Sequence, residues 1–220
     1  MKILTWNLER LAKNKNRLII EKINSYDADI LILTETSSAI DFSKSYSFVS
    51  TQLLPQNFDG VKYKGGENRA TIWTKYKIVS SCKTYDCYTS VCSEVETNFG
   101  SMLIYGTIIG VFGGRDERFK KDMEAQLIDF ENLSNNKHVC IAGDFNVSFL
   151  GYAYPSYEAR KKLTDNFEKL GLINCTATIS ESVNHIVLNS YFEKKITDIQ
   201  VWNIDKKLSD HFGVCVTISE

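Results

Sequence analysis

Short apolar runs, each bounded by polar segments, constrain the fold of this chain more than any other feature. Runs of this length that are rich in Ile, Val and Leu indicate buried β-strands. Three stretches with apolar side chains at helical spacing, residues 18–23, 119–133 and 159–170, lie between them. The segments Lys77–Tyr85 and Val91–Thr97 follow each other without a helix, so we expect a hairpin and a mixed rather than a parallel sheet. The predicted buried strands are Ile3–Trp6, Ile30–Leu33, Thr71–Thr74, Leu103–Ile109, Val139–Ala142 and Phe212–Ile218.

The chain is long enough for one domain with a sizeable core. It has 220 residues, 43% of them hydrophobic, and only two prolines, so we expect a single domain over residues 1–220. The formal net charge of −1 excludes a strongly basic nucleic-acid-binding protein, although a local basic groove on a neutral body stays compatible with it. Asn7, Glu9 and Arg10 interrupt the first apolar stretch, and no run reaches the ~20 apolar residues of a membrane helix. We therefore expect a cytoplasmic protein with no membrane association and no obligate protein partner.

Polar residues adjoin four of the predicted strands. In open α/β sheets, ligand sites form where strands end and loops begin, so we expect side chains from several strand ends to meet in one polar cluster. Any one of these segments alone would carry little information. The residues are Asn7, then Thr34 and Glu35, then Gly143, Asp144 and Asn146, and finally Ser209, Asp210 and His211.

Several side chains of this cluster are of the type that binds a hard divalent cation. Mg²⁺ prefers oxygen ligands and keeps several waters, so one or two carboxylates suffice. Glu35 is the first candidate ligand, with Asn7 and Asp210 assisting directly or through water. A glutamate that ends a strand is also often only a solvated carboxylate, and this alternative stays open.

Other members are suited to acid–base chemistry. Gly143 permits a tight turn, Asp144 can accept a proton from water, and Asn146 can donate to a phosphate oxygen. His211 can donate to a phosphoryl oxygen as negative charge is redistributed in the transition state. The alternatives are an Asx turn that caps a loop at residues 144–146, and a structural histidine beside an apolar strand.

Four short segments together resemble the endonuclease/exonuclease/phosphatase superfamily. TWNLE (5–9), LTE (33–35), GDFN (143–146) and SDH (209–211) stand in the order and approximate spacing of that superfamily, and the resemblance extends from Ile3 to Ile218. It implies a four-layer α/β sandwich, in which two mixed sheets pack face to face between outer helices. It also implies a metal-dependent phosphoesterase that uses Mg²⁺, with Mn²⁺ as the alternative metal.

The resemblance also implies a role for each member of the cluster. The residues that correspond to the family's metal site are Asn7, Glu35 and Asp210. Those that correspond to its water- and phosphate-orienting pair and to its transition-state donor are Asp144, Asn146 and His211. Arg69, in the segment GENRATIW (66–73), corresponds to a phosphate contact, and the alternative is a strand-edge arginine in solvent.

Two positions depart from the family pattern. A histidine that is common in a Thr-His-Leu strand of the family aligns with Ile108, so one donor to the phosphate is missing unless Tyr105 replaces it, as a tyrosine does in the abasic-site endonucleases. The aspartate that holds the SDH histidine aligns with Asn184. Asp198 is the rival placement, but it lies too close to Asp210 for the strand and loop that usually separate the two.

These features predict a Mg²⁺-dependent hydrolase of phosphodiesters, with DNA or RNA as the substrate and Asp144 positioning the attacking water. The alternative enzyme acts on a small phosphorylated molecule. The alternative outside enzymes is an impaired member that only binds nucleic acid or a phospho-ligand, motivated by Ile108 and Asn184. Two groups of basic residues would contact a phosphate backbone or form solvated faces. They are Lys62, Lys64, Arg69, Lys75 and Lys77, and separately Arg115, Arg118, Lys120 and Lys121.

Overall fold

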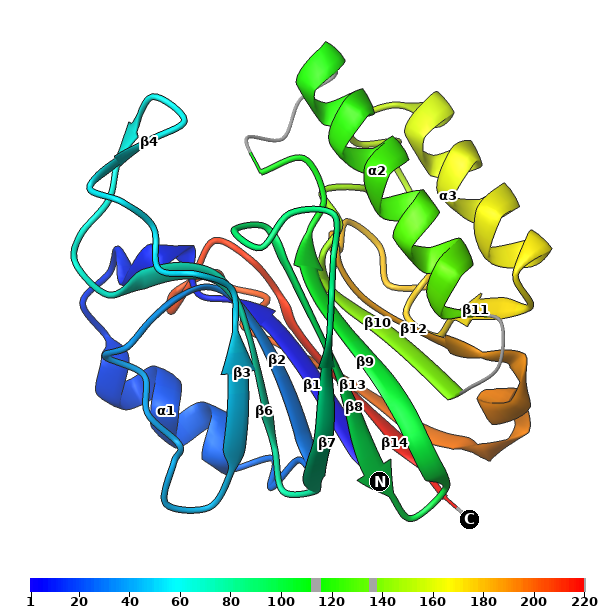
Figure 1. Ribbon diagram of the computed structural model, residues 1–220, viewed down its shortest axis with the longest axis horizontal. Coiled ribbons are helices and arrows are strands. Elements are labelled where there is room, and N and C mark those ends of the chain that lie inside the picture. The colour runs from blue at the N-terminus through cyan, green and yellow to red at the C-terminus, as the bar shows by residue number, and fades with distance from the viewer. Residues whose placement is uncertain (112–115, 135–137, 220) are drawn as a thin grey trace.

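Two six-stranded sheets packed face to face form the centre of the molecule, and helices cover their outer faces (Figure 1). The computed structural model describes residues 1–111, 116–134 and 138–219. Helix α1 (Asn16–Asn24) packs on one sheet, and α2 (Glu117–Leu133) and α3 (Tyr157–Lys169) pack on the other. This arrangement confirms the predicted four-layer α/β sandwich. No helix within the described ranges is long and apolar enough to cross a membrane.

The first sheet mixes parallel and antiparallel strands. Its order is β13-β14-β1-β2-β6-β3, in which β1 and β2 are parallel and the other neighbours are antiparallel. Parallel pairing brings the ends of β1 and β2 to the same edge of the sheet. The strands are β1 (Lys2–Asn7), β2 (Ile30–Ser37), β3 (Ser47–Ser50), β6 (Glu67–Thr74), β13 (Ile196–Trp202) and β14 (Gly213–Ile218).

The second sheet has the same mixed character. Its order is β11-β12-β10-β9-β8-β7, with β9 and β10 parallel. Its strands are β7 (Lys77–Cys82), β8 (Ser90–Thr97), β9 (Gly100–Ile108), β10 (His138–Asp144), β11 (Leu172–Asn174) and β12 (Asn184–Asn189). A small separate hairpin and two short 3-10 helices complete the fold: β4 (Asn57–Phe58) with β5 (Val61–Lys62), η1 (Glu9–Leu11) and η2 (Ser190–Lys195).

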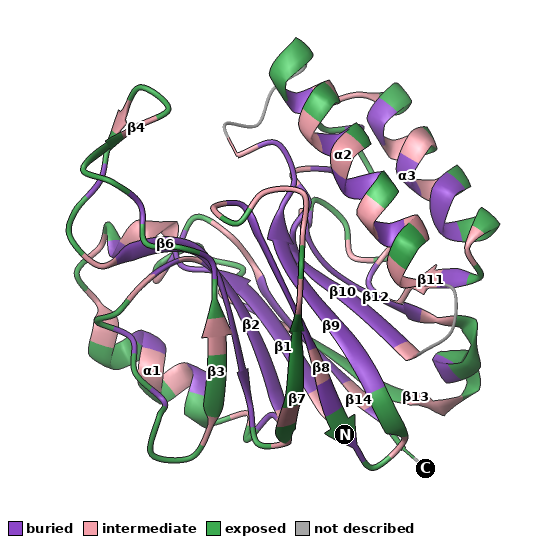
Figure 2. Ribbon diagram, viewed as in Figure 1, coloured by how far each residue is buried: buried purple, intermediate pink, exposed green. Residues whose placement is uncertain are grey.

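Alternation along the strands divides the apolar side chains between the inner core and the outer cores. In β1, Ile3 faces the other sheet, whereas Leu4 and Trp6 face α1. In β9, Ile104 faces the first sheet, whereas Tyr105 packs with α2. Figure 2 shows the result, because the central strands are buried along most of their length and exposed residues lie on the outer sides of the helices and on edge strands.

The sequence reveals the central elements better than the edges. The six predicted strands, the hairpin and the three helices are present. Gly171 follows α3 with a φ of 63°, the left-handed conformation in which many helices end. The predicted strands of the two sheets omit β3, β11, β12 and β13. The side chains of β3 and β13 are mostly exposed or half-buried, so no apolar run marks them.

The strand ends bring the polar residues to one rim of the sandwich. Asn7 ends β1 and pairs with Thr34 of β2. Asp144 ends β10 and pairs with Asn184, the first residue of β12. Gly143 makes the close approach before Asp144 possible, because a Cβ at this position, with φ 140°, would lie 1.9 Å from the carbonyl oxygen of Thr107.

Candidate active site

The Asn7 side chain joins two carboxylates at the base of the cluster. Its Nδ2 donates to Asp144 Oδ2 at 2.9 Å, and the side chain also hydrogen-bonds to Glu35. Its Oδ1 accepts the backbone N–H of Glu9 at 2.8 Å, which determines the direction in which the amide points. Asn7 is fully buried. It therefore presents an N–H donor, rather than its oxygen, to the carboxylates.

Negative charge accumulates around Glu35. Burial raises the pKa of the Glu35 carboxyl, and the nearby carboxylates of Asp144 and Asp210 raise it further. The hydrogen bond from Asn7 and the charge of His211 act in the opposite direction, and the net result is a raised pKa. Glu35 also has a φ of 46°, a conformation that non-glycine residues rarely adopt and that is concentrated at functional sites.

Asp144 is held in one orientation by two donors. Besides the bond from Asn7, its Oδ1 accepts the backbone N–H of Asn146 at 3.0 Å. The side-chain amide of Asn146 donates to the carbonyl oxygens of Ile109 and Gly110, at 3.1 Å and 3.3 Å. The structure thus uses the Asn146 amide to hold the loop after β9, and its contact with a phosphate stays a prediction.

His211 lies between Asn184 and the carboxylates. Its Nδ1 is 3.2 Å from the amide nitrogen of Asn184 and 3.9 Å from Asp144 Oδ2, and its Nε2 is 3.4 Å from Asp210 Oδ1. Asn184 is fully buried, and its Oδ1 meets no donor within the described residues. A half-turn of this amide would bring Oδ1 to the ring, so that Nδ1–H donates to it.

The sequence assignment of Asn184, rather than Asp198, to the position beside His211 agrees with this geometry. Asp198 lies on the edge strand β13, is exposed, and accepts a hydrogen bond from Gln200 at 2.6 Å.

A network not predicted from the sequence holds the loop that carries Asp210 and His211. The buried Ser209 hydroxyl donates to the carbonyl of Asn7 at 2.7 Å and accepts the backbone N–H of His211 at 3.1 Å. Asn203 donates to the carbonyls of Ser209 and His211, at 2.8 Å and 2.7 Å. The Ser209 position in the SDH segment could have suggested this role, whereas Asn203 carries no sequence signal.

The polar cluster opens into a cleft of ≈ 420 Å³ at the rim of the two sheets. Its lining includes Glu35, Asp144, Asn146, Asp210 and His211, so the structure brings together most of the residues selected from the sequence. Asn7 lies beneath this lining, bonded to Asp144.

Tyr105 does not reach the cleft, and the structure contradicts its assignment as a replacement phosphate donor. Its side chain is fully buried, its hydroxyl donates to Asp129 Oδ2 at 2.8 Å, and its ring packs edge-on against Phe130 of α2. Ile108, three residues further along β9, lines a pocket beside Glu35 instead. Residues three apart in a strand point to opposite faces, so Tyr105 cannot stand in for a side chain at position 108.

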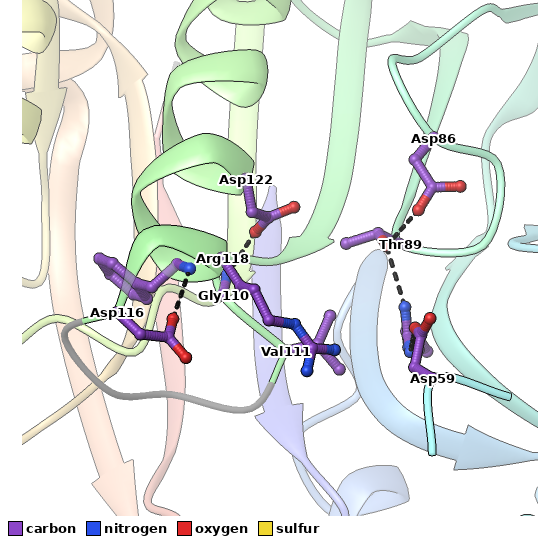
Figure 3. A pocket seen from close by; sticks show the side chains of 10 residues that line it. Asp59, Asp86, Thr89, Gly110, Val111, Asp116, Arg118 and Asp122 are labelled. Atoms are coloured by element: carbon purple, nitrogen blue, oxygen red, sulfur yellow. Dashed lines mark hydrogen bonds and ion pairs between the residues drawn. The ribbon is translucent and has the colours of Figure 1, made fainter. Parts of the chain in front are cut away.

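Arg69 is buried rather than solvated at a strand edge. Its guanidinium donates to Asp59 Oδ2 at 2.7 Å and to Thr89 Oγ1 at 3.1 Å, and only 4% of the residue is exposed. It lines a pocket of ≈ 150 Å³ that shares Val111 with the main cleft. Figure 3 shows this pocket, with Asp59 and Thr89 on one side and Asp122 on the other. Arg69 therefore lies beside the main cleft, and its phosphate contact stays a prediction.

Much of the predicted basic surface is ion-paired. Lys75 pairs with Asp27 and Lys77 with Glu96, and Lys120 pairs with Glu117. Arg115 lies outside the described residues. Lys206, which the sequence does not mark, is the one Lys or Arg among the described residues that line the main cleft.

The donor set fits a hard divalent cation. Burial raises the pKa of Glu35 most, and the neighbouring carboxylates of Asp144 and Asp210 raise it further, so the site gathers negative charge that a cation would balance. The described residues contain no group of three or more His, Cys, Asp or Glu arranged to hold a metal on their own. Mg²⁺ needs no such group, because it takes one or two carboxylates and keeps several waters.

Comparisons with known proteins identify a family and a shared fold. A family model described as the endonuclease/exonuclease/phosphatase family matches residues 4–211. A search of curated proteins found no match. A crystal structure of an endonuclease/exonuclease/phosphatase from Beutenbergia cavernae is similar with a TM-score of 0.75 and 14% identity, over 100% of this chain and 72% of that chain.

Two other solved structures are similar over all of this chain and all of theirs. One is an AP endonuclease from Archaeoglobus fulgidus, with a TM-score of 0.72 and 12% identity. The other is a 3′ phosphatase from Neisseria bound to a product DNA hairpin, with a TM-score of 0.71 and 14% identity. At these identities the similarity shows the fold alone.

Proposed function

Because the chain belongs to the endonuclease/exonuclease/phosphatase family of hydrolases, we propose that it is a divalent-metal-dependent phosphodiesterase that acts on DNA or RNA. One observation carries the proposal: Glu35, Asp144 and His211 gather in one cleft, around an asparagine that bonds both carboxylates. A general base, carboxylate ligands for a cation and an imidazole donor are the groups that hydrolysis of a phosphoester by water requires.

Asp144 is the group that would accept the proton of the attacking water. Asn7 and the backbone N–H of Asn146 each bond one of its oxygens, so the carboxylate is already held in one orientation. Its role therefore requires little reorganisation when water binds.

His211 would donate a hydrogen bond or a proton to a phosphoryl oxygen. Asn184 meets its Nδ1 and so leaves Nε2, on the side of Asp210, for the substrate. Glu35 and Asp210 would hold Mg²⁺, or Mn²⁺, which when bound supplies positive charge to polarise the phosphoryl group.

Nucleic acid is the substrate class that the comparisons support best, because one similar structure is named as bound to a product DNA hairpin. A small phosphorylated molecule is the second candidate. It is favoured by the paired basic residues and by a cleft whose lining has more carboxylates than cations.

The test is a substrate screen with purified protein in Mg²⁺ and in EDTA. Single- and double-stranded DNA, RNA, abasic duplex and small phosphoesters would be compared, with Asp144→Asn as the matched inactive control. We expect Mg²⁺-dependent cleavage of a nucleic acid that the variant loses. Cleavage of small phosphomonoesters only would favour the second candidate, and binding without any cleavage would identify the protein as an impaired member.

A further inference from the structure

An exposed aromatic segment forms part of the rim of the active-site cleft. The segment runs from the end of β10 to Tyr157, the first residue of α3, and several of its side chains are large and apolar. Tyr152 is 75% exposed, Tyr157 is 74% exposed, and Leu150 and Tyr154 are also exposed. Large exposed apolar side chains that gather in one place usually mark a binding surface.

The backbone of this segment is held firmly while its tyrosine side chains stay largely exposed, with the Arg160 guanidinium 5.7 Å from the centre of the Tyr157 ring. Ser148 donates its backbone N–H to the carbonyl of Tyr154 at 2.8 Å, and its hydroxyl accepts the N–H of Tyr154 at 2.9 Å. Arg160 of α3 donates to the carbonyls of Ser148 and Tyr152, at 2.6 Å and 3.1 Å. A loop fixed in this way loses little entropy when a ligand binds to it.

The aromatic segment is continuous with the candidate active site. Tyr154 lines the same cleft as Asp144 and His211. A nucleic-acid strand with one phosphate at Asp144 would therefore carry its neighbouring nucleotides past Tyr154, toward Tyr152 or Tyr157.

The charge of the cleft indicates which part of a nucleotide this rim would contact. The lining includes the carboxylates of Glu35, Glu181 and Asp210, whereas Lys206 is its one Lys or Arg within the described residues. Apart from the cation proposed for Glu35 and Asp210, this lining therefore offers few positive charges to a phosphate backbone. Aromatic side chains instead bind the faces of bases, and only unpaired bases have faces free to stack on them.

We infer that Tyr152, Tyr154 and Tyr157 form a stacking platform for unpaired bases, which makes single-stranded nucleic acid, or an unpaired end, the preferred substrate. This inference rests on the proposed function and specifies its substrate. Stacking of one base on an aromatic side chain changes affinity by roughly five- to hundredfold.

The experiment separates base stacking from hydrolysis. Binding of fluorescent single-stranded and duplex oligonucleotides would be measured by anisotropy with Asp144→Asn protein, alone and combined with Tyr152→Ala and Tyr157→Ala. Turnover of the same oligonucleotides and of a small chromogenic phosphodiester would be measured with otherwise wild-type protein. Tyr191→Ala is the control, because Tyr191 is 53% exposed and lies in η2, which follows β12 at the end opposite Asn184.

We expect the double tyrosine variant to bind the single strand at least about tenfold more weakly, with a smaller change for the duplex and none for Tyr191→Ala. Tyr152→Trp should retain the affinity of wild type, because tryptophan keeps an aromatic face. The KM for single strands should rise much more than the KM for the small phosphodiester.

Two results would overturn the inference: single-strand affinity unchanged in the double variant, or an equal loss for duplex and single strand. Either can occur while the small phosphodiester is still cleaved, and the proposed function then stands. If the wild-type protein cleaves no phosphodiester at all, the proposed function is rejected. The anisotropy measurement would then still decide whether the tyrosines bind unpaired bases.

Discussion

At the scale of single residues, Asn7 helps to determine how the buried Asp144 and the half-buried Glu35 are arranged. Its side chain bonds both Asp144 and Glu35, while its oxygen is engaged by the backbone of Glu9. The sequence marks Asn7 as a metal-site residue. In the proposed function, Asn7 would orient the carboxylates, and Glu35 and Asp210 would supply the oxygens for a cation.

The first prediction concerns Glu35. Replacing it with Gln should weaken Mg²⁺ binding and lower turnover by about two orders of magnitude, because a neutral amide replaces the anionic ligand of a hard cation. Turnover measured against Mg²⁺ concentration should therefore require more metal in the variant. Glu21→Gln is the control, since Glu21 pairs with Arg17 on the surface of α1. Full wild-type activity in EDTA would contradict the metal-dependent assignment.

The second prediction concerns the neutral partner of His211. Asn184→Asp should move the alkaline limb of the pH–rate profile to higher pH, because an adjacent carboxylate favours a protonated imidazole. Turnover should be unchanged or raised. Asp198→Asn is the matched control, and it should leave the profile in place because Asp198 is exposed on β13. A shifted limb in the control, with none in Asn184→Asp, would reject the pairing of Asn184 with His211.

Among these residues, those at the ends of apolar strands can be predicted from the sequence, whereas those whose contacts depend on loop folding cannot. Glu35, Asp144 and His211 were identifiable because each adjoins a strand whose apolar run is unmistakable. Tyr105 was assigned wrongly, although the alternation of a strand already places it on the opposite face from Ile108. The contacts of Ser209 and Asn203 could not be predicted, because they depend on how the loop before β14 folds back on β1.

At the scale of elements, His185 connects β12 to two loops, the one that precedes β12 and the one that follows β10. Its Nε2 is 2.9 Å from the carbonyl of Val147 and 3.1 Å from that of Ser182, and its Nδ1 is 3.0 Å from the hydroxyl of Thr176. Because Nε2 faces two acceptors, it carries the proton of the neutral ring. Burial lowers the pKa of His185 to about 4.

The third prediction is a loss of stability in mild acid. In the unfolded chain the side chain of His185 is protonated below about pH 6.5, whereas in the folded protein it stays neutral down to about pH 4. Proton binding therefore favours unfolding as the pH falls through this window. The free energy of unfolding from urea titrations should fall by about 2 kcal/mol between about pH 8 and about pH 5. His185→Gln should lack most of this loss, and an equal loss in the variant would assign it to other groups.

Strand order is the part of the fold that the sequence did not determine. Periodicity identifies β14 and β1 as strands, but their pairing joins residues near opposite ends of the chain. The edge strand β13 completes that sheet with few buried side chains, so neither its existence nor its place follows from a local pattern.

At the scale of the whole molecule, the described lining of the cleft is more acidic than basic. The net charge is −1, and Lys75 and Lys120, which the sequence offered as backbone contacts, pair with acidic neighbours. Affinity for nucleic acid would then depend on base stacking and on the metal site more than on counterion release. The affinity for nucleic acid should then depend only weakly on salt concentration.

The fourth prediction is a shallow salt dependence of single-strand binding. Each phosphate that a cation neutralises contributes a slope of about −0.7 to a plot of log affinity against log salt concentration. With Lys206 as the one Lys or Arg among the described cleft residues, we expect a slope no steeper than about −2 in anisotropy titrations of Asp144→Asn protein with KCl. Lys206→Gln should reduce the slope by about 0.7, whereas Tyr152→Ala should lower affinity at every salt concentration and leave the slope unchanged, because it removes stacking and no phosphate contact. A slope of about −4 or steeper would show an extended backbone-binding groove and contradict this account of how the protein holds a strand.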